Sequence, residues 1–511
     1  MKRFSTNPTR RDFIGRMLGG LGAAGMGGTM AQMSLMNQVY ASTPACSDDG
    51  YKALVCIFLN GGNDANNMIV PLEVSAGGAA STGAGSSYAA YQNSRGILAL
   101  PASELLPITD KVSNAAGGYD DSNEWAFHRA LGDQFITEEG VASGKSIHSL
   151  FQDGRAAVVA NVGTLVGPTT QSQFLSNGVE VPPQLFSHSD QSAQWQSSLC
   201  DQPFRTGWGG RIADMLNDCA GTPNVSMAMS MSGFGKLLIG ENPSVGQYVA
   251  NRGKIAAFIG NEQSLTSTGA YTDNLAGIMR RGFDIEYERP HAGILGESYR
   301  DLFNQTLSKT EFLGGVIAGE TNINLFPNSS LGNQLSLVAK LISKRETIGQ
   351  KRQIFFCSLG SWDTHSKHLE SHAALLSELS QAVGVFYKEL EALNVEDDVV
   401  SFTTSDFGRT YTPNGDDAVL SGSDHGWGSH ALVVGGALNG RQIFGAMPNL
   451  TPGGPDDTSN DASTSRGRWI PTTSVDEYAA KLASWYGLSS EELNTVFPNL
   501  NRFSSTNLNF L

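Results

Sequence analysis

An apolar run near the C-terminus reads Val399-Val400-Ser401-Phe402-Thr403-Thr404 and leads directly into Ser405-Asp406-Phe407-Gly408-Arg409. The run predicts a buried strand, because it is short, rich in apolar and β-branched side chains, and ends in a polar turn. A second run, Ala431-Leu432-Val433-Val434, predicts another strand and follows Ser423-Asp424-His425-Gly426. Acids and histidines are thus gathered at strand ends, where open α/β sheets bind their ligands. The pattern indicates a metal-dependent active site.

Three further apolar runs predict core strands, at Tyr51–Leu59, Ala156–Val162 and Gln353–Leu359. Between Ser371 and Leu393 the apolar residues recur at helical spacing. This predicted helix lies between two predicted strands, which is the order of a βαβ crossover. The sequence therefore predicts an α/β fold with parallel strands. Near the end, the segments that begin at Ser474 and Ser489 resemble capping boxes and predict two short helices.

Two segments fit the strand-helix pattern poorly. Residues 75–95 are rich in Gly, Ala and Ser and predict a flexible surface insertion, and residues 222–324 predict a cap or an insertion. Cys200 and Cys219 lie close together in a loop-like region, where a disulfide is plausible in an oxidising compartment.

The composition excludes one class of partner. The chain has 511 residues, a formal net charge of −15 and only 16% charged residues, so it lacks the Lys and Arg that a phosphate backbone requires. We therefore expect no nucleic-acid binding. The length is sufficient for one large α/β domain, which we place at residues 51–511.

The N-terminus carries the pattern of a twin-arginine export signal, Arg10-Arg11-Asp12-Phe13. A weakly apolar, glycine-rich stretch follows, and small residues suit cleavage after Ala41. We expect residues 1–41 to be removed by this export, which implies the twin-arginine translocase as a partner, a periplasmic or secreted protein, and no stable membrane span after cleavage. Such substrates are typically exported already folded.

Acids and histidines follow four predicted strands. The metal-ligating candidates are Asp64, Asp363, His365, Asp406 and His425. Carboxylates and imidazoles are the usual ligands of zinc, manganese and magnesium in hydrolytic sites. A single Asp at a strand end is more often a helix cap, so the prediction depends on the combination. For other histidines the structural reading is favoured: His128 positions a loop or caps a helix, and His372 faces solvent.

Several motifs together resemble an exported bacterial family catalogued as domain of unknown function 1501. They are the twin-arginine leader, Phe58–Asp64, Trp362–His365, Asp406–Thr410, Asp424–Gly436 and the closing stretch Tyr478–Leu500. The family is grouped with the alkaline phosphatase and sulfatase superfamily. The resemblance therefore implies an alkaline phosphatase-like architecture, a mostly parallel central sheet sandwiched by helices.

The resemblance also implies one or two divalent metal ions beside a hydroxyl or thiol nucleophile. By position, Asp64, Asp406 and His425 resemble metal ligands, and Asp363 with His365 or His368 resembles the acid-and-histidine pair of the other metal. Phe407 departs from the pattern, because the superfamily usually has a histidine there. The nearest nucleophile candidate is Ser189 or Ser192.

Two hypotheses follow from the sequence. The first is an exported metal-dependent hydrolase of phosphate or sulfate esters, with a small-molecule or polysaccharide substrate. In this hypothesis Ser189, His188 and Arg409 are catalytic, with Arg409 on the substrate oxyanion and His188 as general base or ligand. The alternative is a non-catalytic scaffold with the same fold, for cell-envelope assembly or carbohydrate binding.

Overall fold

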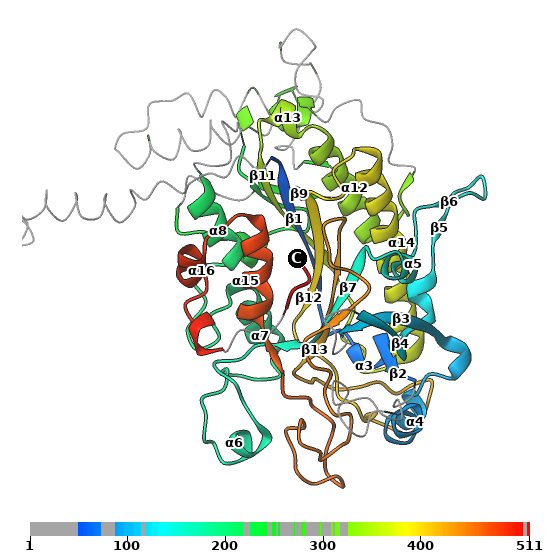
Figure 1. Ribbon diagram of the computed structural model, residues 1–511. Coiled ribbons are helices and arrows are strands. Elements are labelled where there is room, and N and C mark those ends of the chain that lie inside the picture. The colour runs from blue at the N-terminus through cyan, green and yellow to red at the C-terminus, as the bar shows by residue number, and fades with distance from the viewer. Residues whose placement is uncertain are drawn as a thin grey trace, which may run out of the picture. The chain divides into compact units, whose positions relative to one another are not determined.

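The computed structural model describes residues 50–72, 87–113, 119–217, 225–242, 325–503 and 508–511, with short pieces between 248 and 316 (Figure 1). They belong to one unit, Asp49–Leu511. The expected signal peptide and most of the expected cap, residues 222–324, lie outside the described residues. Within the described ranges, no helix has the length and apolar character needed to cross a membrane.

A ten-stranded sheet forms the centre of this unit, in the order β10-β9-β8-β11-β1-β12-β13-β7-β14, with β15 also pairing with β7. Most neighbours are parallel; β13 is antiparallel to both β12 and β7, and β10 is antiparallel to β9. The strands are β1 (Lys52–Leu59), β7 (Ala156–Gly163), β8 (Ala228–Ser230), β9 (Tyr248–Asn251), β10 (Lys254–Ile255), β11 (Arg352–Leu359), β12 (Val399–Ser405), β13 (Ser429–Val434), β14 (Ile443–Phe444) and β15 (Thr473–Ser474).

Strand β1 alternates its side chains between two cores. Val55 and Ile57 belong to one apolar cluster, whereas Leu54, Cys56 and Phe58 belong to another. A strand buried on both faces is expected where helices cover both sides of a parallel sheet. This explains why the predicted strands are continuously apolar instead of alternating.

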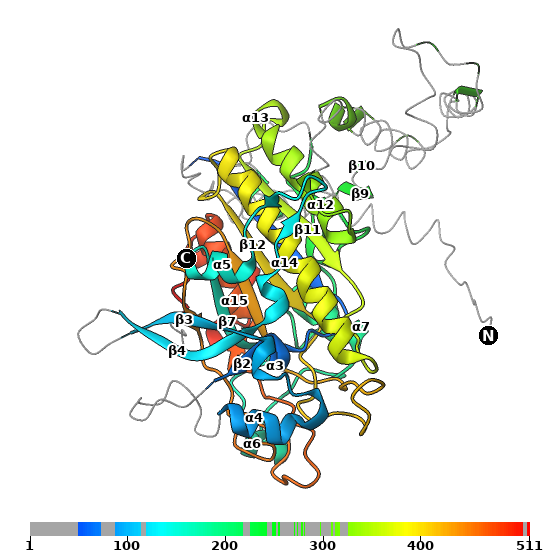
Figure 2. The same cartoon turned by 90° about the vertical axis from the view of Figure 1, so that its right-hand side faces the viewer.

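Helices cover both faces of the sheet (Figures 1 and 2). On one side lie α5 (Ile147–Gln152), α12 (Ser330–Ser343) and α14 (His368–Ala392), and on the other α8 (Trp208–Leu216), α15 (Val475–Tyr486) and α16 (Ser490–Val496). The predicted α/β class, a mostly parallel central sheet flanked by helices, is confirmed. The predicted capping boxes of α15 and α16 are confirmed as well.

Smaller elements complete the chain. A second sheet has the order β2-β4-β3, and β5 pairs with β6. These elements are β2 (Ile69–Pro71), β3 (Leu105–Ser113), β4 (Tyr119–His128), β5 (Phe135–Ile136), β6 (Ala142–Ser143), α3 (Ala65–Met68), α4 (Tyr88–Arg95), α6 (Gln171–Leu175), α7 (His188–Ser197) and α13 (Arg345–Ile348).

The structure corrects three expectations and leaves a fourth untested. Residues 88–95 are not a flexible loop but form α4, whose last residue, Arg95, is fully buried. Residues 228–230 are not part of a cap, because β8 pairs with β11 in the central sheet. His372 does not face solvent but is buried on α14. The suggested disulfide between Cys200 and Cys219 stays a prediction, because Cys219 lies outside the described residues; Cys200 itself is buried.

The register of the three central strands places the functional loops. Leu59 at the end of β1 pairs with Leu359 of β11 and with Ser405 of β12. The three parallel strands therefore end at the same edge of the sheet. The loops that carry the predicted acids and histidines leave from this edge.

Candidate metal centre

Glycine allows the first two of these loops to approach each other. Gly61 follows β1 with a φ of +123°, and a Cβ at this position would collide with the backbone nitrogen of Asp363. The backbone N–H of Trp362 donates to the carbonyl of Asn60 at 3.2 Å. The sequence Asn60-Gly61 is thus needed to hold the Asp363 loop against the end of β1.

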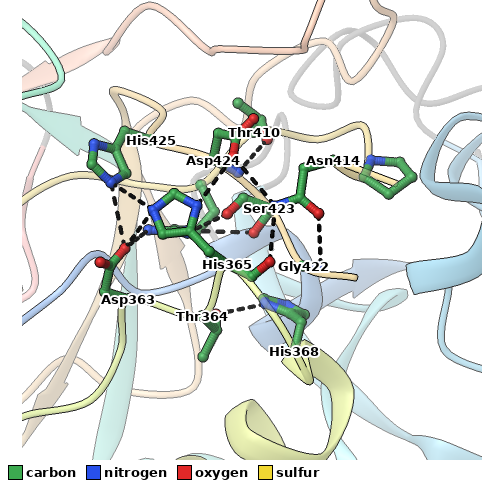
Figure 3. A network of polar contacts seen from close by, with 12 residues as sticks. Asp363, Thr364, His365, His368, Thr410, Asn414, Gly422, Ser423, Asp424 and His425 are labelled. Atoms are coloured by element: carbon green, nitrogen blue, oxygen red, sulfur yellow. Dashed lines mark hydrogen bonds and ion pairs between the residues drawn. The ribbon is translucent and has the colours of Figure 1, made fainter. Parts of the chain in front are cut away.

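Three residues from separate segments offer metal-ligating atoms within 4.8 Å of one another: His188, Asp363 and His425. Asp363 Oδ1 lies 3.5 Å from His188 Nε2 and 3.4 Å from His425 Nε2. The Nε2 atom of His365 is 2.9 Å from the same oxygen and 3.0 Å from His425 Nε2. Figure 3 shows the rings of His365 and His425 directed toward Asp363. We call these four residues the metal-centre cluster.

The outer nitrogen of each histidine in the cluster is held by an acceptor. His188 Nδ1 lies 2.6 Å from Asp406 Oδ2, and His365 Nδ1 lies 3.1 Å from Asp424 Oδ1. His425 Nδ1 donates to the carbonyl of Phe186 at 2.7 Å. A proton on Nδ1 leaves the lone pair of a neutral imidazole on Nε2, which faces the cluster. This outer-shell arrangement is the one that orients metal-ligating histidines.

The inner atoms of the cluster are therefore mostly acceptors that face one another. His188 Nε2 is buried and has no hydrogen-bond partner among the described residues. Lone pairs at these separations repel unless a proton or a cation lies between them. Zinc ligands about 2.0–2.1 Å from a tetrahedral ion would lie roughly 3.3–3.4 Å apart, which matches the distances from Asp363 Oδ1 to His188 and His425. The donor set fits a divalent metal ion.

Local charges adjust the protonation of the cluster. The hydrogen bond to Asp406 raises the pKa of His188, whereas burial lowers the pKa of His425. Partial burial opposes the ionisation of Asp363, but the hydrogen bond and charge of Arg409 outweigh it and lower the pKa of this carboxyl. Asp363 is thus ionised and His425 neutral at neutral pH.

Phe407 forms a wall of the cluster. Its ring centroid lies 4.7 Å from those of both His188 and His425, and the side chain is fully buried. A residue that the superfamily resemblance expects to be a ligand is thus replaced here by an apolar contact. Its packing restricts the orientation of two of the histidines.

Arg409 is held by hydrogen bonds within the protein. Its Nη1 donates to Asp363 Oδ1 at 2.7 Å and to the carbonyl of Gly61 at 3.3 Å, and its Nη2 and Nε donate to the carbonyl and hydroxyl of Ser423. The side chain is 1% exposed. In this arrangement each nitrogen of the Arg409 guanidinium donates within the protein, and the side chain orients Asp363.

Ser189 is exposed on the first turn of α7. Its hydroxyl donates to Asp190 at 3.0 Å and lies 3.1 Å from the hydroxyl of Ser187. Neither contact is with a histidine of the metal-centre cluster. His188, its neighbour in sequence, is the residue of this segment that joins the cluster.

Asp64 lies in a separate buried network. Its Oδ2 accepts from Nη2 of Arg95 and lies 2.6 Å from His368 Nε2, and His368 Nδ1 lies 2.6 Å from the hydroxyl of Thr364. Burial would raise the pKa of Asp64, but the charges of Arg95 and His368 lower it well below its usual value. The guanidinium of Arg95 is thus the counter-ion of this buried carboxylate.

The structure brings three of the predicted ligands together, namely Asp363, His365 and His425. Asp406 contacts this cluster only through the Nδ1 atom of His188. The sequence patterns missed the Arg95–Asp64–His368 network, because Arg95 lies in a segment rich in Gly, Ala and Ser. The sequence did indicate His368, because this residue closely follows Asp363 and His365 and is the first residue of α14.

Two solved structures are similar to this chain at low scores. A crystal structure of Ps i-CgsB in complex with k-i-k-neocarrahexaose is 8% identical, with a TM-score of 0.28 over 87% of this chain and 74% of that chain. PsFucS1 sulfatase from Pseudoalteromonas sp. is 12% identical, with a TM-score of 0.23 over 80% of this chain and 67% of that chain. At these scores the similarity carries no conclusion about activity.

Sequence comparison gives one further result. No curated protein matches the chain. Residues 318–462, which include α12, β11, α14, β12, Asp363, Asp406 and His425, match the family described as protein of unknown function (DUF1501).

Proposed function

We propose that this chain is an exported hydrolase of phosphate or sulfate esters that uses a divalent metal ion at the metal-centre cluster. The observation that carries the proposal is the convergence of three imidazole Nε2 atoms on one oxygen of Asp363, with an acceptor behind each ring. Imidazole-rich sites favour zinc or another transition metal over magnesium. The Arg95–Asp64 pair favours one ion over two.

Each protein group has a defined task in this proposal. A bound metal lowers the pKa of a water molecule and neutralises charge on the ester oxyanion. Asp406 and the carbonyl of Phe186 fix the orientation of His188 and His425, and Arg409 fixes that of Asp363. The cluster is open to solvent, with side chains between 23% and 44% exposed, so an ester can reach it.

A non-catalytic scaffold with a structural metal is the second candidate. The observation that favours it is that Ser189 donates to Asp190 and that every guanidinium nitrogen of Arg409 donates within the protein, so two proposed catalytic groups are engaged elsewhere. Export by the twin-arginine route to the periplasm or beyond belongs to both proposals. It is supported by Arg10-Arg11-Asp12-Phe13.

Elemental analysis of the purified protein, combined with a screen of aryl phosphates and aryl sulfates, separates the two candidates. The hydrolase is supported if the protein contains bound metal and turns over an ester. A chelator should then abolish this turnover, and added metal should restore it. Stoichiometric metal with no turnover on either ester class favours the scaffold. Protein that neither carries nor binds a divalent metal ion contradicts the hydrolase, and if it also hydrolyses neither ester class it favours a scaffold that holds no metal.

Metal affinity should rise with pH between about pH 6 and about pH 8. Protons compete with the metal for His188 Nε2, and the raised pKa of His188 extends this competition above the usual value near 6.5. His425 and Asp363 compete less, because their pKa values are lowered. Zinc titration by calorimetry in buffers of different ionisation enthalpy should show proton release that declines as pH rises. A pH-independent affinity over this range would contradict the assignment of His188.

A further inference from the structure

Two arginines of one short segment lie next to the metal-centre cluster. Arg466 Nη2 donates to Asp424 Oδ2 at 2.8 Å, and Asp424 Oδ1 holds His365. Arg468 Nε donates to the backbone carbonyl of His425 at 2.8 Å. Arg468 therefore contacts a histidine of the cluster directly, and Arg466 is linked to another through Asp424.

Both guanidinium groups retain unused donors. Arg466 Nε donates to the hydroxyl of Thr412, and its Nη2 also donates to the carbonyl of Pro413. Within the described part of the chain, Nη1 of Arg466 and both terminal nitrogens of Arg468 have no hydrogen-bond acceptor. Both side chains are partly exposed, so these donors are accessible to a ligand. Arg409, by contrast, is buried, and each of its three guanidinium nitrogens donates within the protein.

The position of Arg468 is fixed on two sides. Its guanidinium lies over the ring of Phe186, 4.5 Å from the centroid, and its Nε is tied to His425. The carbonyl of Phe186 in turn accepts from His425 Nδ1. Stacking and a backbone hydrogen bond hold the plane of the guanidinium while its outer edge stays open. An ordered planar fork of this kind suits bidentate binding of an oxyanion.

The two positive charges lie close enough to oppose each other. Burial lowers the pKa of Arg468, and the positive charge of Arg466 lowers it further. The chain as a whole is strongly acidic, with a formal net charge of −15, so paired arginines beside the cluster are not part of a general basic surface. A bound anion would relieve the repulsion between them.

We propose that Arg466 and Arg468 bind a tetrahedral oxyanion of the substrate, a sulfate or phosphate group, beside the metal-centre cluster. The role of this anion as a substrate group rests on the proposed function. In this proposal the two arginines bind the substrate oxyanion, which is the role that the sequence predicted for Arg409. It restricts the substrate class to esters that carry their anionic group within reach of His425 and Asp424.

Titration of inorganic sulfate and, separately, inorganic phosphate into the metal-loaded full chain tests the proposal, at constant ionic strength held with chloride. We expect Arg466→Gln and Arg468→Gln each to weaken oxyanion binding about tenfold, because each removes charged hydrogen bonds. The anion that binds more tightly identifies the ester class. Arg502→Gln is the matched control, since Arg502 is 41% exposed and pairs with Asp201 at 2.9 Å. It should bind like wild type.

Three results would overturn the proposal: no binding of either anion by the wild type, unchanged binding in both variants, or an equal loss in Arg502→Gln. The same titration on metal-free protein separates this proposal from the proposed function. If the chain binds no metal but Arg466→Gln and Arg468→Gln still weaken oxyanion binding, the arginine site stands and the hydrolase fails. If metal binds and esters turn over while both variants bind the anions normally, only the arginine site fails.

Discussion

Replacing Asp363 by asparagine is expected to reduce zinc affinity by more than about 100-fold, since loss of outer-shell partners alone typically costs 10–100-fold. Asp363 supplies the one anionic atom on which the cluster histidines converge, at 2.9 to 3.5 Å. Asparagine keeps the shape of the side chain but removes its charge. The rate of ester hydrolysis by this variant should fall in parallel with its zinc affinity.

Two further variants provide comparisons for the zinc affinity of Asp363→Asn. Asp406→Asn removes the acceptor charge behind His188 and should lower zinc affinity by about 10–100-fold, because it acts only through the orientation and basicity of that ring. Asp153→Asn breaks an exposed ion pair with Lys145 and should leave zinc binding unchanged. Zinc affinity is measured by competition with a chromophoric chelator, and unfolding curves verify that each variant is folded. If Asp363→Asn binds zinc like wild type, the cluster is not the metal site.

The sequence was sufficient for the scaffold of this site. Strands β1, β7, β11, β12 and β13 were predicted within about two residues of their bounds, because strands buried on both faces of a central sheet are continuous apolar runs. Their order in the sheet was not predictable in this way. It depends on which strands are neighbours in space, and β1 lies between β11 and β12 although it comes first in the chain.

The division of roles among the polar residues was less predictable. Asp64, Asp363 and Asp406 all follow strands at the same edge, yet only Asp363 faces the cluster. Asp64 turns toward a guanidinium, and Asp406 toward the outer nitrogen of His188. These choices are made by partners far away in sequence, Arg95 and His188. The local sequence at a strand end does not specify which distant residue will pair with the acid there.

Replacing Arg95 by methionine is expected to lower the free energy of unfolding by about 3–5 kcal/mol, because it leaves a buried carboxylate without its counter-ion. Arg95 and Asp64 are both fully buried, and their ion pair is direct. Arg95 also donates to the carbonyls of Thr410 and Tyr411 at 2.8 Å. The loop that follows β12 therefore loses two hydrogen bonds as well.

The double variant Arg95→Met with Asp64→Asn separates charge from packing. Removing both charges should recover a large part of the loss, since an isosteric neutral replacement of a buried ion pair is often close to neutral in stability. The sign of the pH dependence adds a second test. The lowered pKa of Asp64 stabilises the wild type above the unfolded value near 3.9, and this contribution disappears as pH falls through the folded pKa.

In Arg95→Met the pKa of Asp64 should rise, so the stability difference from wild type should narrow on acidification from neutral pH. Urea unfolding at several pH values measures this difference. A single-variant loss below about 1 kcal/mol would show that the pair contributes no more than an exposed one. A double variant no more stable than Arg95→Met would assign the loss to the hydrogen bonds with Thr410 and Tyr411. In that case Arg95 would stabilise the loop after β12 through its backbone contacts, and the charge of Asp64 would be incidental.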